Sequence, residues 1–436
     1  MRGQHFLIVL WMLAAVSSVD AQVDDEPLRE VRPGVYVGIS SCANGFCHGA
    51  VEPLAETAVL QNEYPTWMLD PHRRAYERLA GPEFQAVAEA LEPGKKATEV
   101  KLCLGCHALD VPPQLSDGLY IEDGISCEGC HGPAGGWRDR HFEEGWTHAQ
   151  SVRAGMKDLR DPARRGEVCL ACHLGAEGRA VDHRLIAAGH PRLFFELDNA
   201  AGALPRHWKL DAERPDRPAS HGVRAWAVGQ AVAFREGLEQ LARHAESGTW
   251  PEFAEYNCQS CHHSLADAAW RRQPGYRHQG GLPRWSAARA AVLRHLAGER
   301  EDLDRAMDGL GRLMASMGPR EQVAVKAREL AGRLDAVAGE LAKKRWTKDE
   351  VRDTMRRLAA DREPFLTDVA AAEQLAFALQ SLMSRRVELD RRQLRSTAVA
   401  AIDGLFSELD DPHAFDRERF DRRLGELEEA VNQTKE

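Results

Sequence analysis

The sequence predicts a mainly α-helical protein built in two parts, and three observations lead to this prediction. All 10 cysteines lie before residue 262, in segments where Gly and Pro interrupt long elements. After residue 285 there is no cysteine, and apolar residues recur at the spacing of α-helices. The first 21 residues form a separate, largely apolar segment. We therefore expect a first domain with little regular structure in 22–285 and a C-terminal helical bundle in 286–436.

The N-terminal segment has the features of a secretory signal peptide. Arg2 precedes the apolar run Phe6–Val16, and Val19-Asp20-Ala21 offers small residues for cleavage. The run is too short for a membrane anchor, because crossing a bilayer core takes about 20 apolar residues. No later stretch is long enough either. We expect residues 1–21 to be removed on export, to the periplasm or another exported location, and no transmembrane segment in the mature chain.

Every cysteine belongs to a pair, and a histidine directly follows the second cysteine of each pair. Four motifs read C-x-x-C-H and one reads C-x4-C-H: Cys103, Cys106 and His107; Cys127, Cys130 and His131; Cys169, Cys172 and His173; Cys258, Cys261 and His262; and Cys42, Cys47 and His48. This pattern is typical of covalent c-type haem attachment. The two sulfurs add to the haem vinyl groups, and the histidine becomes the proximal iron ligand. The sequence thus predicts five covalently attached haem c groups.

Two other metal centres explain the pattern less well. Zinc sites also use C-x-x-C pairs, but they do not require a histidine after every second cysteine. Iron–sulfur clusters need four thiolates each and give the histidines no role. For the stretched motif, a small disulfide loop between Cys42 and Cys47 is the alternative. Gly45 favours the haem interpretation, because it eases the bulge that two extra residues impose.

The C-terminal part shows helical periodicity over most of its length. Apolar residues step by three and four positions from Leu303 to Met317 and from Val323 to Leu341. Thr347 and Glu350 form a T-x-x-E capping box that begins a further helix. Similar patterns cover Val369–Met383 and Leu394–Phe406. We expect a bundle of four or five amphipathic helices, with its methionines in the core rather than on iron.

The sixth ligand of each iron decides between an electron carrier and an enzyme. An iron with two histidines is closed and exchanges electrons, whereas an iron with one histidine can bind a small molecule. Ten further histidines lie between residues 22 and 285: His72, His141, His148, His183, His190, His207, His221, His244, His263 and His278. They are enough to close every haem, so their number leaves the question open.

Local context favours some of these histidines as distal ligands. His72 lies in a predicted helical stretch, His141 closely follows the third motif, and Gly189 and Pro191 fix the approach of His190. His148 and His183 are weaker distal candidates. Less favoured are His263, which directly follows a proximal ligand, and two methionines: Met68 and Met156.

The stretch from Cys42 to His173 resembles the tetrahaem cytochrome c-554 family, within the wider group of multihaem cytochromes related to hydroxylamine oxidoreductase and pentahaem nitrite reductase. The matching pieces are the first motif with a Trp and the His72 segment behind it, then CLGCHAL, GISCEGCHGP with His141 downstream, and CLACHLG. The resemblance implies that His72 and His141 are distal ligands. It also implies a five-coordinate iron at His107, which is the candidate for an open haem.

The chain departs from that family in its stretched first motif, its fifth motif and its long helical tail. The family's distal ligand just before the fourth motif has no counterpart in RDPARRGEV, so His190 or His183 is the candidate to replace it. The C-x-x-C-K motif of pentahaem nitrite reductases is absent, and nothing supports the tyrosine crosslink of hydroxylamine oxidoreductases. Membership in either enzyme class is not supported.

The leading functional hypothesis is an exported pentahaem cytochrome that transfers electrons between redox partner proteins of a respiratory chain. The alternative is an oxidoreductase that acts on a small nitrogen or sulfur oxide at the His107 haem. In either case the helical bundle can also dock or scaffold a larger respiratory complex. The net charge of −10 argues against nucleic acid as a partner and favours a partner with a basic docking patch.

Overall fold

The computed structural model describes residues 32–54, 59–209, 221–262, 283–298, 300–390 and 396–432. The predicted signal peptide lies outside this range, as do two of the histidines considered above, His263 and His278. Its cleavage and the export of the chain therefore stay predictions.

The prediction of a mainly α-helical fold is confirmed. The strands found in the described residues are β1 (Gly175–Ala176) and β2 (Arg179–Ala180), which form a small antiparallel hairpin with Gly175 opposite Ala180. None of the described helices is both long and apolar enough to cross a bilayer.

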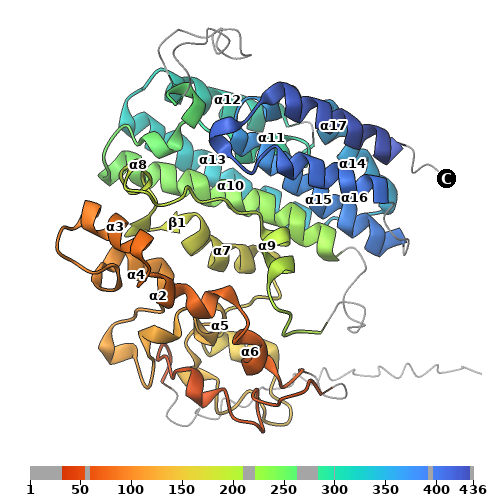
Figure 1. Ribbon diagram of the computed structural model, residues 1–436. Helices are drawn as coiled ribbons and strands as arrows, with labels where there is room; N and C mark the ends of the chain where they lie inside the picture. Colours follow the sequence, from red (N-terminus) through yellow and green to blue (C-terminus); the bar gives the residue numbers. More distant parts are fainter. Residues whose placement is uncertain are drawn as a thin grey trace, which may run out of the picture.

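The N-terminal part consists of short helices joined by irregular segments, as the frequent Gly and Pro predict. Its α-helices are α1 (Glu63–Trp67), α2 (Ala75–Arg78), α3 (Pro82–Leu91), α4 (Lys101–His107), α5 (Cys127–His131), α6 (His148–Arg153), α7 (Pro162–His173), α8 (His183–Ala187) and α9 (Leu197–Ala203). Figure 1 shows α2, α5 and α6 as a lower layer, α3 and α4 at the left beside β1, and α7, β1 and α9 between the lower layer and the helices above.

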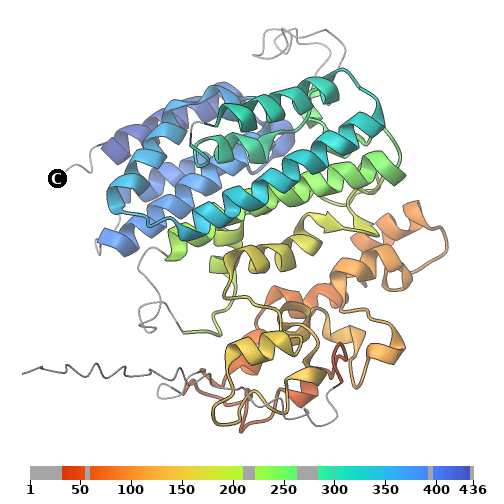
Figure 2. The same ribbon diagram turned by 180° about the vertical axis from the view of Figure 1, so that it is seen from behind.

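The C-terminal part is a layer of longer helices (Figures 1 and 2). They are α10 (His221–Ser247), α11 (Ala288–Arg294), α12 (Glu301–Ala315), α13 (Arg320–Lys343), α14 (Lys348–Ala360), α15 (Val369–Asp390), α16 (Ser396–Ser407) and α17 (Arg417–Asn432). The capping box is present at α14: the Thr347 hydroxyl accepts from the Glu350 backbone N–H, and the Glu350 carboxylate accepts from the Thr347 N–H.

The sequence analysis was wrong on two points of this layer. It expected four or five helices after residue 285, and the structure also forms α11 and α17 there. It expected short, irregular elements before residue 285, yet α10 is a continuous helix of 27 residues. Alternation of Ala and Val with Gly and Trp hid its periodicity, because α10 is buried on several faces at once.

The main hydrophobic core crosses the expected domain boundary. It is continuous from Leu170 in α7 through Trp226 and Val232 in α10 to Leu427 in α17. Residue 285 therefore lies inside one core rather than between two. The division into domains 22–285 and 286–436 therefore stays a prediction. In the structure, α7, α9 and α10 pack with the bundle.

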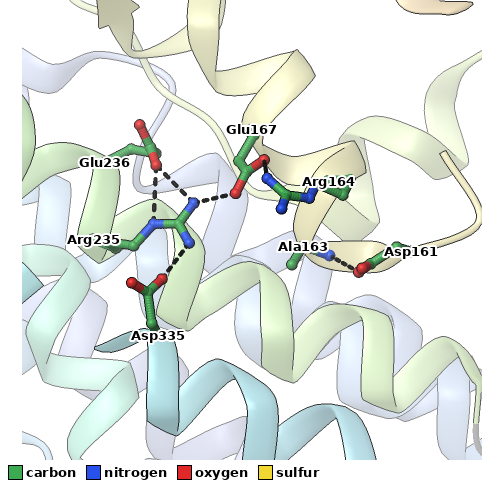
Figure 3. A network of polar contacts seen from close by, with 7 residues as sticks. All are labelled: Asp161, Ala163, Arg164, Glu167, Arg235, Glu236 and Asp335. Carbon is green, nitrogen blue, oxygen red and sulfur yellow. Dashed lines mark hydrogen bonds and ion pairs between the residues drawn. The ribbon is translucent and has the colours of Figure 1, made fainter. Parts of the chain in front are cut away.

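Small residues bring α7 and α9 close to α10. A Cβ added at Gly166 of α7 would meet Val232 of α10 at 3.1 Å, and one at Gly229 of α10 would meet Leu197 of α9 at 2.9 Å. Arg235 of α10 ties three elements together (Figure 3): its guanidinium contacts Glu167 of α7 at 2.5 Å and Asp335 of α13 at 2.6 Å. The carboxyl end of α7, which carries the fourth motif, is thus fixed on the bundle.

We expect Leu330→Ala to lower the free energy of unfolding by about 2–5 kcal/mol, since Leu330 is 1% exposed at the centre of α13 and its loss leaves a cavity. Val325→Ala on the same helix is the control, because Val325 is 56% exposed and its loss should change the free energy by less than about 0.5 kcal/mol. Urea unfolding followed by circular dichroism measures both values. Equal effects of the two changes would contradict the placement of α13.

Candidate haem sites

Three of the five motifs are the last turn or the whole of a helix. They end α4, make up α5 and end α7. In a helix, residues three apart lie on one face, so the two cysteines of each motif point the same way and the histidine follows within the same turn. At the start of α7, the Asp161 side chain caps the helix by accepting from the Ala163 N–H, and Pro162 occupies the first position.

The other two motifs lie in or directly after 3₁₀ turns rather than in α-helices. Cys258 begins the 3₁₀ turn η9 (Cys258–Ser260), and Cys42 follows the 3₁₀ turn η1 (Ile39–Ser41). Between Cys42 and Cys47 the chain closes by hydrogen bonds from the Cys47 and Gly49 N–H groups to the Asn44 carbonyl. All ten cysteines are free thiols, so the structure shows no disulfide between Cys42 and Cys47.

Four motif histidines each face a second imidazole that comes from elsewhere in the chain. His48 stacks on His141 with ring centres 6.0 Å apart, and His173 meets His72 at 5.8 Å. The ring of His131 lies 6.3 Å from that of His207, and His262 lies 6.3 Å from His183.

This separation is the one that two axial ligands of a single iron require. An imidazole nitrogen binds a metal at about 2 Å and its ring centre lies roughly 1 Å further out, so two axial rings stand about 6 Å apart. Rings in ordinary packing contact lie about 4.5–7 Å apart, so the separation has room for an iron but does not by itself require one. The four pairs therefore fit an iron between them.

Hydrogen bonds at Nδ1 leave Nε2 available on three of these rings. Nδ1 of His48 lies 2.9 Å from Glu63, and Nδ1 of His72 lies 2.8 Å from Asp70. Nδ1 of His141 donates to the Arg138 carbonyl at 2.5 Å. Partners of this kind fix the orientation of a metal-bound imidazole, and a carboxylate partner also makes it a stronger donor to the metal.

Burial keeps two of the motif histidines neutral. It lowers the pKa of His131 and of His173 to about 4 in each case, because the charged ring would lose its hydration. A neutral imidazole is the form that binds iron, so both rings are ready to act as ligands near neutral pH.

His107 differs from the other four motif histidines. Its ring meets the edge of Phe84 at 5.4 Å rather than a second imidazole, and its Nδ1 donates to the Ala75 carbonyl at 3.0 Å. Burial lowers its pKa, and the nearby His190 lowers it further. His190 is half-buried, however, with its Nδ1 turned to its neighbour's carbonyl at Pro191.

The structure thus separates the predicted distal candidates. It brings His72, His141 and His183 opposite motif histidines, whereas it leaves His190 near His107 without ring contact and directs Nε2 of His148 to Asp158 at 2.9 Å. Sequence reasoning did not favour His207, because nothing next to it in the sequence shows that it lies over His131. His244 pairs with Glu255 instead.

Contacts between cysteines place the motifs next to one another. The pKa of the Cys42 thiol is lowered to about 6 because the Cys127 thiol hydrogen-bonds to it. In the same way, Cys106 lowers the pKa of Cys172 to about 6. The first motif therefore lies beside the third, and the second beside the fourth.

A buried carboxylate holds the third motif against the first. Glu128, between the two cysteines of α5, accepts from the N–H groups of Val37 at 3.0 Å, Gly38 at 2.9 Å and Ala134 at 2.7 Å. Gly38 begins the turn that leads to Cys42. This residue was not anticipated from the sequence, where a glutamate within a motif reads as an exposed side chain.

Comparison with known proteins gives this arrangement a family. The family model for cytochrome c554 and c-prime matches residues 42–132. Cytochrome c-554 of Nitrosomonas europaea is 34% identical over 171 residues, which cover 34% of this chain and 70% of that protein. The chain belongs to the cytochrome c-554 family. No solved structure matches the chain.

Membership of the cytochrome c-554 family makes the protein a multihaem c-type cytochrome, with haem c as its cofactor and electron transfer as its chemistry. The residues present fit this cofactor, since free thiol pairs, adjacent imidazoles and facing imidazoles occur together in one chain. The family model ends at residue 132, so the fourth motif, the fifth motif and the bundle lie beyond it.

We expect Glu128→Ala to lower the free energy of unfolding by at least about 2 kcal/mol, because it leaves buried backbone N–H groups without acceptors. Urea unfolding, followed through the haem absorbance at about 400 nm, measures this change in the free energy of unfolding. Glu122→Ala is the control, since Glu122 is exposed. A loss no larger than that of the control would contradict the role of Glu128.

Proposed function

We propose that the protein is an exported pentahaem cytochrome of the c-554 family that transfers electrons between redox partner proteins. The observation that carries the proposal is the pairing of four motif histidines with a second imidazole at 5.8–6.3 Å. An iron held on both sides in this way has no position for a substrate and exchanges electrons only.

The cysteines and histidines of the five motifs would hold the haems. The distal ligands would be His141 opposite His48, His207 opposite His131, His72 opposite His173, and His183 opposite His262. Haem c supplies reversible one-electron oxidation and reduction at iron. The remaining work belongs to the protein: Glu63 and Asp70 orient His48 and His72, and burial excludes water from His131 and His173.

Export and partner choice are part of the proposal. The predicted signal peptide and the use of every cysteine in a haem motif support a location outside the cytoplasm. The net charge of −10, to which haem propionates would add, supports a partner with a basic docking surface.

A second function is favoured by one observation at the His107 motif. His107 meets the ring of Phe84 and, among the described residues, no second imidazole, so an iron on His107 would have a position left for a small ligand. On this ground we propose, as the second candidate, that the protein acts on a small nitrogen or sulfur oxide at this motif.

Haem counting and spin-state spectroscopy test both proposals on the purified full-length protein. We expect a mass increase of five haems, with four irons low-spin and one high-spin in paramagnetic resonance. The carrier function alone is supported if nitric oxide and cyanide leave the high-spin signal unchanged, and the second function is supported if they shift it. Five low-spin irons would contradict the open position at His107.

We expect His183→Ala to keep all five haems and to convert one low-spin iron to high-spin, because it removes a distal ligand while His262 stays. His148→Ala is the matched control, since Nε2 of His148 is turned toward Asp158, and it should leave the spectrum unchanged. Paramagnetic resonance and the haem count by mass give the two readouts. An unchanged spectrum in both variants would contradict the ligand role of His183.

A further inference from the structure

The fifth motif is held in place by residues of the bundle rather than by the other motifs. The Asn257 backbone N–H donates to the Arg284 carbonyl at 2.7 Å, and the Ser286 N–H donates to the Glu255 carbonyl at 2.9 Å. The Asn257 amide donates to Asp368, the residue before α15, at 2.9 Å. This pairing brings residues 284–286 and the start of α11 alongside Cys258.

Arg192 is one of the cations that this packing gathers near Cys258. Burial raises the pKa of the Cys258 thiol and the Arg192 guanidinium opposes that rise, so Arg192 lies close to the sulfur. Its guanidinium is already engaged in an ion pair with Glu373 of α15, a side chain that is only 11% exposed.

For Arg289, in the first turn of α11, no ion-pair partner is found among the described residues. Its Nε is shielded from solvent and donates no hydrogen bond within the described part of the chain. Glu255 is the acid that favours its charge, but that carboxylate accepts from His244 Nδ1 at 2.8 Å. Burial lowers the pKa of Arg289, Glu255 opposes this, and the like charge of Arg192 adds to the lowering.

A bound anion would stabilise an arginine in this position. A shielded guanidinium without a carboxylate costs free energy, and a second guanidinium nearby increases the cost. A bound carboxylate offsets both, because the planar fork of arginine donates two parallel hydrogen bonds to it. A c-type haem carries two propionate carboxylates on the edge of its ring.

We propose that Arg289, with Arg192 beside it, binds a propionate carboxylate of the haem attached at Cys258 and Cys261. This inference rests on the fifth haem of the proposed function and assigns a residue of the bundle to it. Residues 192 and 289 lie outside the segment that the family model matches.

Redox titration of the full-length protein, monitored by absorbance and paramagnetic resonance, tests the proposal. Arg289→Gln should keep five haems, and the preference of one low-spin iron for its reduced form should fall about tenfold, which is about 59 mV for one electron. The loss of a positive charge near the haem favours oxidised iron, so the shift is toward lower potential. Arg289→Lys keeps the charge but not the fork and should shift the same iron less, by about threefold.

Two further variants make the result specific. Arg328→Gln is the matched control, because Arg328 is a half-exposed arginine that pairs with Glu239 and Glu246, and it should shift no potential. In a Cys258→Ala, Cys261→Ala background, which lacks the fifth haem, Arg289→Gln should also shift none.

The outcomes separate this inference from the proposed function. A wild-type chain that carries only four haems overturns the fifth haem and this site with it. Five haems with potentials that neither Arg289→Gln nor Arg289→Lys changes overturn the arginine site alone. A shift of equal size in the four-haem background assigns Arg289 to another haem and likewise overturns it.

Discussion

The structure depends on holding pairs of imidazoles about 6 Å apart across positions that are distant in sequence. His48 and His141 are separated by the whole of the second and third motifs, and His131 and His207 by the whole of the fourth. Hydrogen bonds at Nδ1 orient some of these rings, as Glu63 does for His48, and burial lowers the pKa of others, as at His131. A porphyrin between the rings would complete the packing of this part of the molecule.

The helical bundle acts as a platform for two of the motifs. The fourth motif ends α7, which packs on α10 through Gly166 and is tied by Arg235 to α13. The fifth motif is tied to the start of α15 by the Asn257–Asp368 hydrogen bond. Removing residues 286–436 would therefore expose the buried faces of α10. Any effect of such a deletion on partner binding would then be confounded with a loss of folding.

The match to the cytochrome c-554 family model covers the first three motifs, and the upper layer of helices lies outside it. The matched segment 42–132 contains the first three motifs and Glu128, whose carboxylate accepts from Val37 and Gly38 just before that segment. The extension adds a fifth motif whose histidine faces His183 and whose surroundings contain Arg192 and Arg289. The proposed fifth haem would thus be bound by His183 and Arg192 together with Arg289 of the bundle.

Sequence by itself determined the haem chemistry, because a C-x-x-C-H motif places its three reactive groups within one turn and needs no distant residue. It also determined the mainly α-helical fold and the helices α12–α15, whose apolar residues repeat along one face. The start of α14 at Thr347 follows from a local hydrogen-bonding pattern. Only the tertiary structure decided which histidine faces which motif, since each facing histidine lies 76 to 101 residues away in the sequence and has no local signal. For this reason His207 was missed, His190 was favoured without forming a ring pair, and α10 was hidden within a stretch expected to be irregular. Burial on several faces, and contacts between distant segments, are properties of the folded chain.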